Sequence, residues 1–139
     1  MWPLVVADKP SCVTIRGGTH VPKAPTSDFI ECVFLPTVAR MGCFVNYQMN
    51  RAGYYPTGRG EISAEIIPAE TIAPVSFTSR PEAVRIELTS AVSNLPMSIA
   101  ERQMGTGVKR LRAMGLESKG RNVEYPSLGK GTLFFISCA

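Results

Sequence analysis

The chain has 139 residues, of which 45% are hydrophobic and 19% are charged. This composition excludes the disordered class of weakly hydrophobic, highly charged chains, and the length suffices for one ordinary domain or two small ones with a real core. Fifteen Lys and Arg residues against eleven Asp and Glu residues give a formal net charge of +4, which is compatible with a polyanionic partner but does not require one.

The cysteine and histidine content argues against a metal site. None of the four cysteines forms a C-x-x-C pair, and the one histidine, His20, cannot complete a zinc site of the usual pattern. We therefore expect no metal ligands and predict that the cysteines are reduced, buried, small hydrophobic residues. No apolar stretch reaches the roughly eighteen residues that a membrane span needs. We thus expect no membrane association and a reducing intracellular location, cytoplasmic or nuclear.

Three segments in the first half have strand patterns. A β-prone run at 12–15 ends at Gly17-Gly18, as a strand that stops at a turn does. Further strands are predicted at 43–49 and 61–67, with a glycine-rich turn region between them. Because apolar and polar residues alternate in the last of these segments, we expect a hairpin with one face in water.

The spacing between the first two strands predicts a helix. Asp28 and Glu31 resemble a capping box at its start, and Gly42 stands where a C-terminal glycine cap would lie. Pro36 should bend this helix or interrupt one turn. Its apolar face would consist of Ile30, Phe34, Val38 and Met41.

The second half repeats the order of the first. Prolines and weak periodicity mark a boundary, so we divide the chain into a first unit at 1–70, a linker at 71–82 and a second unit at 83–139. In the second unit, strands are predicted at 83–88, 116–125 and 132–138.

A helix is predicted between the first two of these strands. Ser98 and Glu101 form another capping-box pattern, and Gly115 would end the helix. Gly105 and Gly107 oppose this helix, because each costs about 1 kcal/mol relative to alanine. The apolar face would consist of Ala100, Met104, Val108 and Leu111. The fold class predicted is therefore α+β, with two strand-helix-strand-strand units, each a small sheet covered by a helix.

The loop at 16–25 joins a strand to the start of a helix. Ligands often bind in such loops, because glycines let a ligand approach the backbone and the helix N-terminus favours anions. Many strand-to-helix loops with two glycines bind nothing, so the loop alone leaves a purely structural role open.

Short motifs run through the chain in a recognisable order. They are Val-Thr-Ile-Arg-Gly-Gly-Thr-His at 13–20, Ala-Pro at 24–25, Phe-Leu-Pro at 34–36, Arg-Met-Gly at 40–42, Gly-Tyr-Tyr-Pro at 53–56 and Leu-Pro at 95–96. In this order they resemble the middle repeat of the RNA 3'-terminal phosphate cyclases. Each motif is generic, but the series makes a chance match improbable.

The resemblance implies a fold and an activity. In that family a two-helix, four-stranded unit is repeated and a smaller α+β domain is inserted, so 1–70 would be part of a repeat and 83–139 most of the insert. The implied activity is ATP-dependent conversion of an RNA 3'-phosphate to a 2',3'-cyclic phosphate, through adenylation of a histidine and with help from a divalent cation. The implied partners are RNA 3' ends.

Departures from the family pattern limit what this resemblance implies. The segments that carry the nucleophilic histidine and the early nucleotide loop have no counterpart here, so we expect a fragment without catalytic residues that is inactive alone and binds no cofactor tightly. His20 stands where the family pattern tolerates Asn, Asp or His, and no acidic residue nearby in sequence is evidently placed to orient it. We interpret it as a hydrogen-bonded loop residue.

Two further positions matter because of the resemblance. Pro25 matches the proline that lies against the ATP adenine in the family, so it is the candidate cofactor-binding residue; the alternative is a loop proline that fixes the entry to the helix. Arg59 replaces a usual glycine of the hairpin, which puts the conformation of that turn in question.

Basic residues gather in the last third of the chain. Lys109, Arg110 and Arg112 fall on the predicted second helix away from its apolar line, with Lys119 and Arg121 expected close by. They are the candidate RNA-binding residues, and binding through phosphates would be independent of RNA sequence. The alternative is that these charges only keep the surface soluble.

Two functions remain open at this point. The chain is either a cyclase fragment, completed by another chain if it is active, or a non-catalytic RNA- or protein-binding module in RNA processing or ribosome assembly. Because an excised repeat exposes sheet edges, we also expect self-association.

Overall fold

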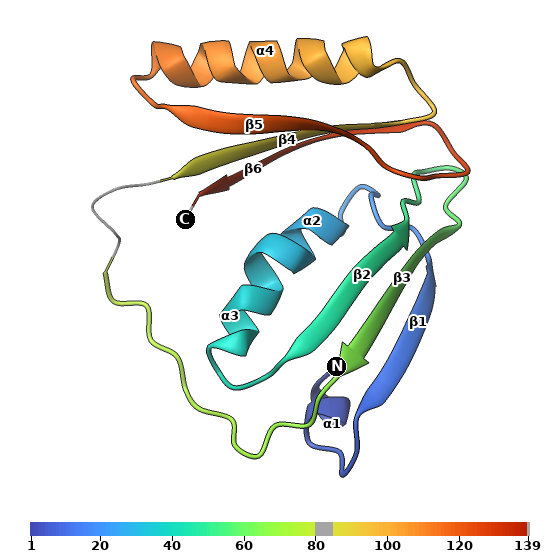
Figure 1. Cartoon of the computed structure of the whole chain (residues 1–139), viewed down its shortest axis with the longest axis vertical. Coiled ribbons are helices and arrows are strands. Elements are labelled where there is room, and N and C mark those ends of the chain that lie inside the picture. Colours follow the sequence, from blue (N-terminus) through green and yellow to red (C-terminus); the bar gives the residue numbers. More distant parts are fainter. Residues whose placement is uncertain (80–84, 139) are drawn as a thin grey trace.

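The computed structural model of the chain describes residues 1–79 and 85–138. These residues form two three-stranded sheets with helices, a mixed α+β fold as predicted (Figure 1). Positions 80–84 lie outside the described residues, and with them the end of the predicted linker at 71–82 and the start of the strand predicted at 83–88.

The first sheet has the strand order β1-β3-β2. The strands are β1 (Ser11–Gly17), β2 (Val45–Arg51) and β3 (Gly60–Ile66), and both outer strands pair with β3 in antiparallel register. Consequently β1 and β2 run parallel to each other on either side of β3. The predicted strand and hairpin are confirmed, with boundaries shifted by one or two residues.

The helix between β1 and β2 is interrupted, as the position of Pro36 predicts. It consists of α2 (Ser27–Phe29), the π-helical turn η1 (Ile30–Phe34) and α3 (Leu35–Ala39), here called the helical segment. A π turn holds one extra residue and therefore rotates the next helical turn about the axis. As a result Leu35 packs with Val38 in the core, whereas Phe34, which the helical spacing placed on the apolar face, is 37% exposed.

The predicted capping box at the start of this helix is wrong. The N-cap is Thr26, whose hydroxyl accepts a hydrogen bond from the Phe29 amide at 3.3 Å. Asp28 lies inside the first turn and is buried, because its carboxylate is engaged elsewhere. The predicted glycine end is confirmed: Gly42 has a φ of +90°, and its amide donates to the Ala39 carbonyl.

The core of the first unit lies under the helical segment. Its buried residues are Val5, Val38, Cys43 and Ile66. Val5 comes from a short helix that the sequence did not predict, α1 (Trp2–Val5), and the Ala69 amide donates to the Val5 carbonyl at 2.8 Å. The N-terminal turn therefore packs beside the end of β3.

The second sheet has the strand order β5-β4-β6. Its central strand β4 (Ile86–Ser93) pairs in parallel with β5 (Ser118–Glu124) and antiparallel with β6 (Gly131–Cys138). The alternation at 83–88 predicted only the first part of β4, because the strand continues through a run of buried residues to Ser93.

One face of this sheet is covered by α4 (Met97–Ala113). The helix follows Pro96 with no side-chain cap, so the capping box predicted at Ser98 is wrong, but the predicted apolar line is confirmed, with Ala100 fully buried. Gly107 has a packing role: a Cβ at this position would lie 2.3 Å from the Phe134 ring.

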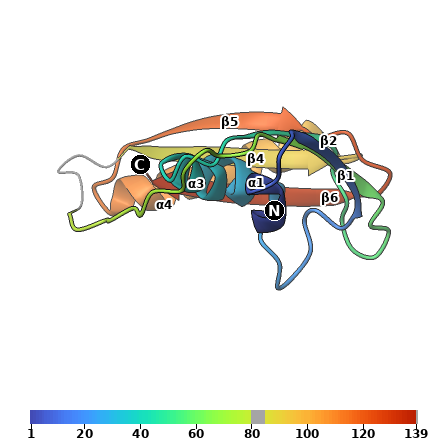
Figure 2. The same cartoon turned by 90° about the horizontal axis from the view of Figure 1, so that it is seen from below.

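The two units are in contact, with the helical segment of the first facing the side of the second sheet that α4 leaves uncovered. In Figure 1 the second sheet lies between α4 and the helical segment. Seen from below, the molecule is flat (Figure 2). The turn that follows β5 reaches the first unit, where the Ala52 amide donates to the Pro126 carbonyl at 2.8 Å and the Ser127 hydroxyl donates to the Ala52 carbonyl at 2.8 Å.

Candidate functional site

The loop between β1 and α2 is fixed to the hairpin of the same sheet. The amides of Thr19 and His20 both donate to the Gly53 carbonyl at 3.0 Å, and the Gly53 amide donates to the Thr19 hydroxyl at 2.9 Å. A Cβ at position 53 would lie 2.4 Å from the Gly60 nitrogen, so this approach of the two backbones requires glycine. Pro25 lies at the end of this loop and is exposed.

His20 is buried, and both of its ring nitrogens have partners. Nε2 lies 3.0 Å from Oδ2 of Asp28, and Nδ1 lies 2.8 Å from the Thr19 hydroxyl. The ring also packs against Tyr54 and Tyr125, with centroids 5.2 and 5.9 Å away. The interpretation of His20 as a hydrogen-bonded loop residue is therefore confirmed.

The expectation that no acid orients His20 is wrong. Asp28 is eight residues away in sequence, and the first turn of the helix brings its carboxylate to the ring. A carboxylate–histidine pair can activate a histidine only if the other nitrogen faces a reactant. Here Nδ1 meets Thr19, which leaves no ring nitrogen free to act as a nucleophile.

Asp28 also joins the two units of the chain. The Tyr125 hydroxyl, at the end of β5, donates to Oδ1 of Asp28 at 2.6 Å. Burial opposes ionisation of Asp28, but the hydrogen bonds from His20 and Tyr125 outweigh it and lower the pKa of this carboxyl. Burial and the bond to the Asp28 carboxylate raise the pKa of Tyr125. The tyrosine therefore stays a donor to a carboxylate, and charge-assisted bonds of this kind are the strong ones.

Other buried contacts support this junction. The Ser93 hydroxyl, at the end of β4, lies 2.8 Å from the Tyr125 carbonyl and 3.4 Å from the Tyr54 hydroxyl. Gly131 packs on the Tyr54 ring so closely that a Cβ would lie 2.2 Å from it. The loop at 16–25 is thus held by residues from both units.

The predicted basic residues do not lie together. Lys109, Arg110 and Arg112 are exposed on α4, as expected. Lys119 and Arg121 were expected nearby, and this is wrong. Because Gly120 faces Met104 of α4, its two neighbours on β5 point to the opposite face of the sheet.

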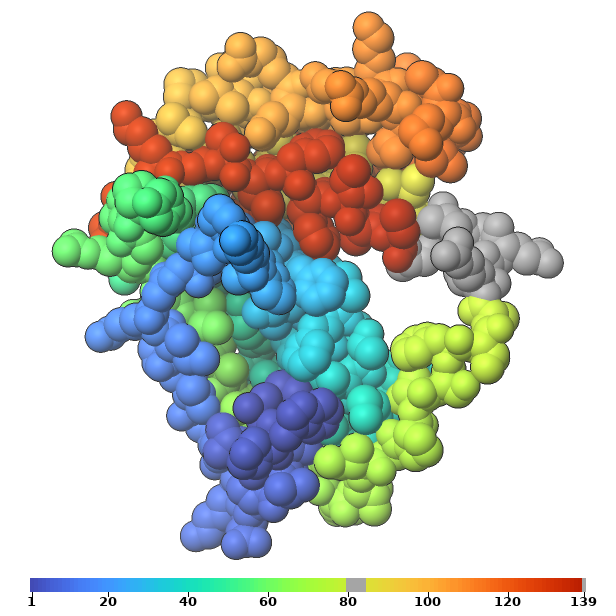
Figure 3. All heavy atoms as spheres, turned by 180° about the vertical axis from the view of Figure 1, so that it is seen from behind, coloured from blue at the N-terminus to red at the C-terminus, as the bar shows by residue number. Residues whose placement is uncertain are grey.

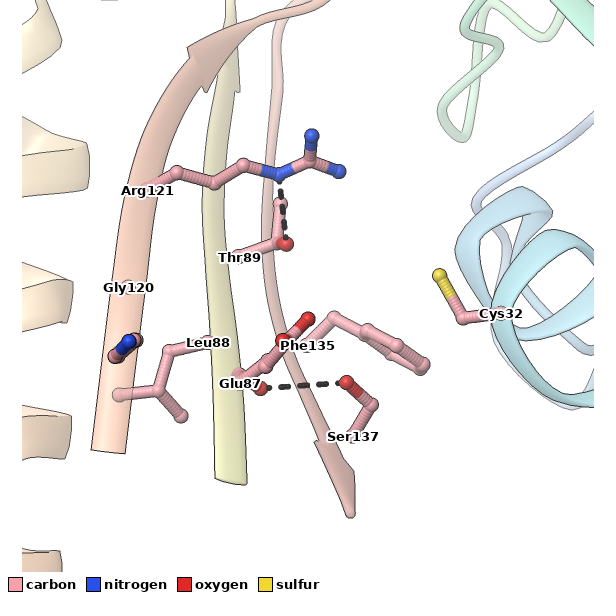
Figure 4. Close-up of a pocket in the computed structure, with 9 residues that line it drawn as sticks. Cys32, Glu87, Leu88, Thr89, Gly120, Arg121, Phe135 and Ser137 are labelled. Atoms are coloured by element: carbon pink, nitrogen blue, oxygen red, sulfur yellow. Dashed lines mark hydrogen bonds between the residues drawn. The ribbon is translucent and has the colours of Figure 1, made fainter. Parts of the chain in front are cut away.

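That opposite face borders a cleft between the two units. A cavity of about 320 Å³ lies there, and Cys32 of the helical segment faces Thr89, Arg121 and Phe135 across it (Figure 4). Nε of Arg121 lies 3.4 Å from the Thr89 hydroxyl, and the end of the guanidinium group points towards the helical segment. This cleft was not predicted, since strand alternation does not say which elements face each other.

The prediction of buried cysteines is wrong for three of the four. Cys43 is buried, whereas Cys12, Cys32 and Cys138 are exposed, and all four are free thiols in the structure. Partial burial and the nearby Glu31 raise the pKa of Cys32, so this thiol is not activated as a nucleophile.

Within residues 1–79 and 85–138, His, Cys, Asp and Glu side chains form no group of three or more that could hold a metal ion. In the same part of the chain, no helix has the length and apolar character needed to cross a membrane.

Comparison with known proteins decides the family. A model of the RNA 3'-terminal phosphate cyclase family matches residues 1–130. The chain belongs to the RNA 3'-terminal phosphate cyclase family. It is 37% identical to the RNA 3'-terminal phosphate cyclase of Koribacter versatilis over 103 residues, which are 74% of this chain and 29% of that protein.

Other cyclases match almost the whole chain. Identity is 30% over 137 residues with the RNA 3'-terminal phosphate cyclase of Trichormus variabilis and 32% over 136 residues with that of Ectopseudomonas mendocina. These matches cover 99% and 98% of this chain and 39% of each relative. The chain therefore spans about two fifths of the length of these cyclases.

The sequence indicated the loop at 16–25 but not the buried residues that hold it, Asp28 and Tyr125. Asp28 was interpreted as a cap, and Tyr125, which lies 97 residues further on, carried no signal as its partner. Neither the burial of Asp28 nor the identity of the residues that bind its carboxylate can be read from local spacing.

Proposed function

We propose that this chain contributes to ATP-dependent cyclisation of RNA 3'-phosphate ends, as part of a cyclase, and that it is inactive alone. The observation that carries the proposal is the Gly-Gly-Thr loop, which is clamped by Gly53 and Asp28 and presents Pro25 to solvent at its end. The family match supports it. Residues 1–70 would belong to a repeat and 83–139 to the insert, joined by a linker at 71–82.

Pro25 would lie against the adenine of ATP. A proline ring is rigid and apolar. Because Pro25 is exposed, a flat base could contact it without any rearrangement of the chain. Bound ATP would supply the adenylate group and a divalent cation would neutralise its phosphates. The chain's own residues would hold the loop at 16–25 in place through the bonds of Thr19 and His20 to Gly53.

Photolabelling with 8-azido-ATP tests this role of Pro25. We expect a labelled peptide that contains residues 21–30 and at least fivefold less labelling in Pro25→Gly. Pro22→Gly, in the same exposed loop, is the matched control and should keep its labelling. Equal labelling of both variants would contradict the role of Pro25.

Inactivity of the isolated chain is expected from His20, the one histidine of the sequence, because both of its ring nitrogens are engaged. Incubated with labelled ATP and Mg²⁺, the chain of 139 residues should form no covalent AMP adduct. An acid-labile adduct that is lost in His20→Ala would overturn this proposal and make His20 the nucleophile.

A second candidate is a non-catalytic RNA-binding module, which the exposed Lys109, Arg110 and Arg112 favour. If each meets one phosphate of single-stranded RNA, replacing all three with glutamine should flatten the slope of log affinity against log salt by about two units. Fluorescence anisotropy measures this slope. An unchanged slope would leave these residues with a solubilising role.

Self-association belongs to the same proposal. In the first unit, β1 and β2 are edge strands, and Ile15 of β1 is 56% exposed. Sedimentation velocity should therefore show dimers or larger species as concentration rises. A monomer over the whole range would show that these edges are protected without a partner.

The free thiols fit a reducing intracellular compartment, which we also propose.

A further inference from the structure

The cleft between the two units is longer than its first cavity. A second cavity of about 550 Å³ shares Cys32, Glu87 and Ser137 with the one of about 320 Å³, so the two adjoin. One wall is the helical segment, and the other is the face of the second sheet that α4 does not cover. Seen from behind, the surface is hollowed where the end of β6 approaches the helical segment (Figure 3).

The charges along this groove are mostly positive. Lys119 and Arg121 contribute from β5, Arg85 from the residue before β4, and Arg40 from the end of α3. Among the described residues that line the two cavities, Glu87 is the one carboxylate. Four cations against one anion on facing walls attract a polyanion more strongly than the net charge of +4 for the whole chain suggests.

Hydrogen-bond donors and aromatic rings accompany these charges. Arg121 uses Nε for Thr89 and directs its remaining donors into the opening (Figure 4). Phe135 lines the first cavity, and Phe77, which is 63% exposed, lines the second with the Arg40 guanidinium 4.6 Å from its ring centroid. Cations that track a backbone, with aromatic faces for the bases, are typical of sites for single-stranded nucleic acid.

We propose that this groove binds a short stretch of single-stranded RNA. Phosphates would lie along Lys119, Arg121 and Arg85, and bases would stack on Phe135 and Phe77. Cavities of these sizes match ligands of one or a few nucleotides rather than a duplex. The proposal rests on the proposed function, because RNA is taken as the ligand, and it assigns the RNA to the face opposite the basic residues of α4.

Two sets of basic substitutions separate the groove from α4. With a fluorescein-labelled ten-nucleotide RNA, Lys119→Gln with Arg121→Gln should weaken binding about tenfold at low salt and flatten the salt slope by about 1.4 units, because single strands lose about 0.7 per phosphate. The triple variant Lys109→Gln, Arg110→Gln, Arg112→Gln tests the second candidate in the same assay. If the groove and not α4 holds the RNA, this variant removes more charge and yet changes both quantities less. The opposite ranking of the two variants would overturn the assignment of the RNA to the groove.

Footprinting of thiols locates the RNA without mutating the groove. Cys32 lines both cavities, whereas Cys12 is exposed on the first sheet beside Thr14 and Ser63. Saturating RNA should slow alkylation of Cys32 at least fivefold and leave Cys12 unchanged, as measured by peptide mass mapping. Bound RNA that leaves Cys32 equally reactive would overturn the proposal.

Two further outcomes distinguish this proposal from the others. Equal protection of Cys32 by a polyglutamate peptide would show a general polyanion site and overturn the assignment to RNA. No RNA binding at low salt would also overturn the groove, while photolabelling at Pro25 would still support the cyclase role. Loss of that photolabelling with protection of Cys32 intact would contradict the role of Pro25 alone.

Discussion

Apart from α1, the two units have the same order of elements, but their sheets differ. In the first unit, the last strand β3 lies between β1 and β2; in the second, the last strand β6 lies outside, next to β4. The helices of the two units also differ. The helical segment of the first unit is broken by a π turn, whereas α4 is one continuous helix of 17 residues.

The connections account for this difference. A loop of nine residues, Gly18 to Thr26, lies between β1 and α2, while three residues separate β4 from α4. A short connection returns the chain beside the strand it left, so β5 pairs directly with β4 and β6 must use the other edge. The long loop lets β2 lie two strands away, and the hairpin then fills the gap with β3. Identical element order therefore does not specify strand order.

Removing the Asp28 carboxylate should have the largest effect, because it joins both units. Asp28→Ala leaves His20 and Tyr125 buried without their acceptor, so we expect a loss of about 3 kcal/mol in unfolding free energy. Urea denaturation measures this loss. Glu31→Ala, exposed on the same helical segment, is the control and should change stability by less than about 0.5 kcal/mol.

If the two variants are equally stable, the junction contributes little and the units are energetically independent. Separate unfolding transitions in Asp28→Ala, one for each sheet, would sharpen the comparison further, because they would show that this carboxylate couples the units.

Two glycines lie within the continuous helix α4 of the second unit. Substituting each of them tests how this helix packs on the sheet. A methyl group at position 107 would meet the Phe134 ring at 2.3 Å, whereas one at position 105 meets nothing within 4 Å. Gly107→Ala should therefore destabilise by about 1–3 kcal/mol through overpacking, and Gly105→Ala should stabilise by about 1 kcal/mol through helix propensity. Thermal unfolding of both variants measures these effects. The same sign for both would contradict the packing of α4 on β6.

The pH dependence of stability tests the charge at the junction. Because the pKa of Asp28 is lower in the folded chain, its contribution is fully present above the ordinary carboxyl pKa of about 4 and is lost as pH falls through the lower folded value. The difference in unfolding free energy between the native chain and Asp28→Asn should thus shrink between pH 6 and pH 3. A difference that grows on acidification would exclude a stabilising carboxylate.

The smallest expected effect concerns the hairpin turn of the first unit. Arg59 has a φ of +54°, a conformation that favours glycine, so the doubt about this turn is resolved: arginine adopts the strained geometry. Arg59→Gly should stabilise the chain by up to about 1 kcal/mol. Arg59→Ala removes the side chain but keeps the strain, and should not stabilise. A gain in both variants would attribute the effect to the side chain instead.

Local pattern was enough for the elements and for the family. Alternation at β3 and helical spacing along α4 each indicate a buried face directly, because side-chain direction repeats with a fixed period. Both predicted capping boxes are wrong, because another residue takes the N-cap position in each helix. Ser98 and Asp28 have the right spacing to an acid, but Pro96 and Thr26 take the N-cap positions, and Asp28 is turned towards His20 and Tyr125.

The sequence by itself determined the α+β class, the order of the elements apart from α1, the interruption of the helix that contains Pro36 and the loop that ends at Pro25. Only the tertiary structure decided the strand orders, the bond from Tyr125 to Asp28 and the separation of Lys119 and Arg121 from the basic residues of α4. The physical reason is the distance along the chain over which each kind of interaction acts. Periodicity and turn residues act within a few positions, whereas pairing and the facing of two units depend on contacts between residues far apart in the chain.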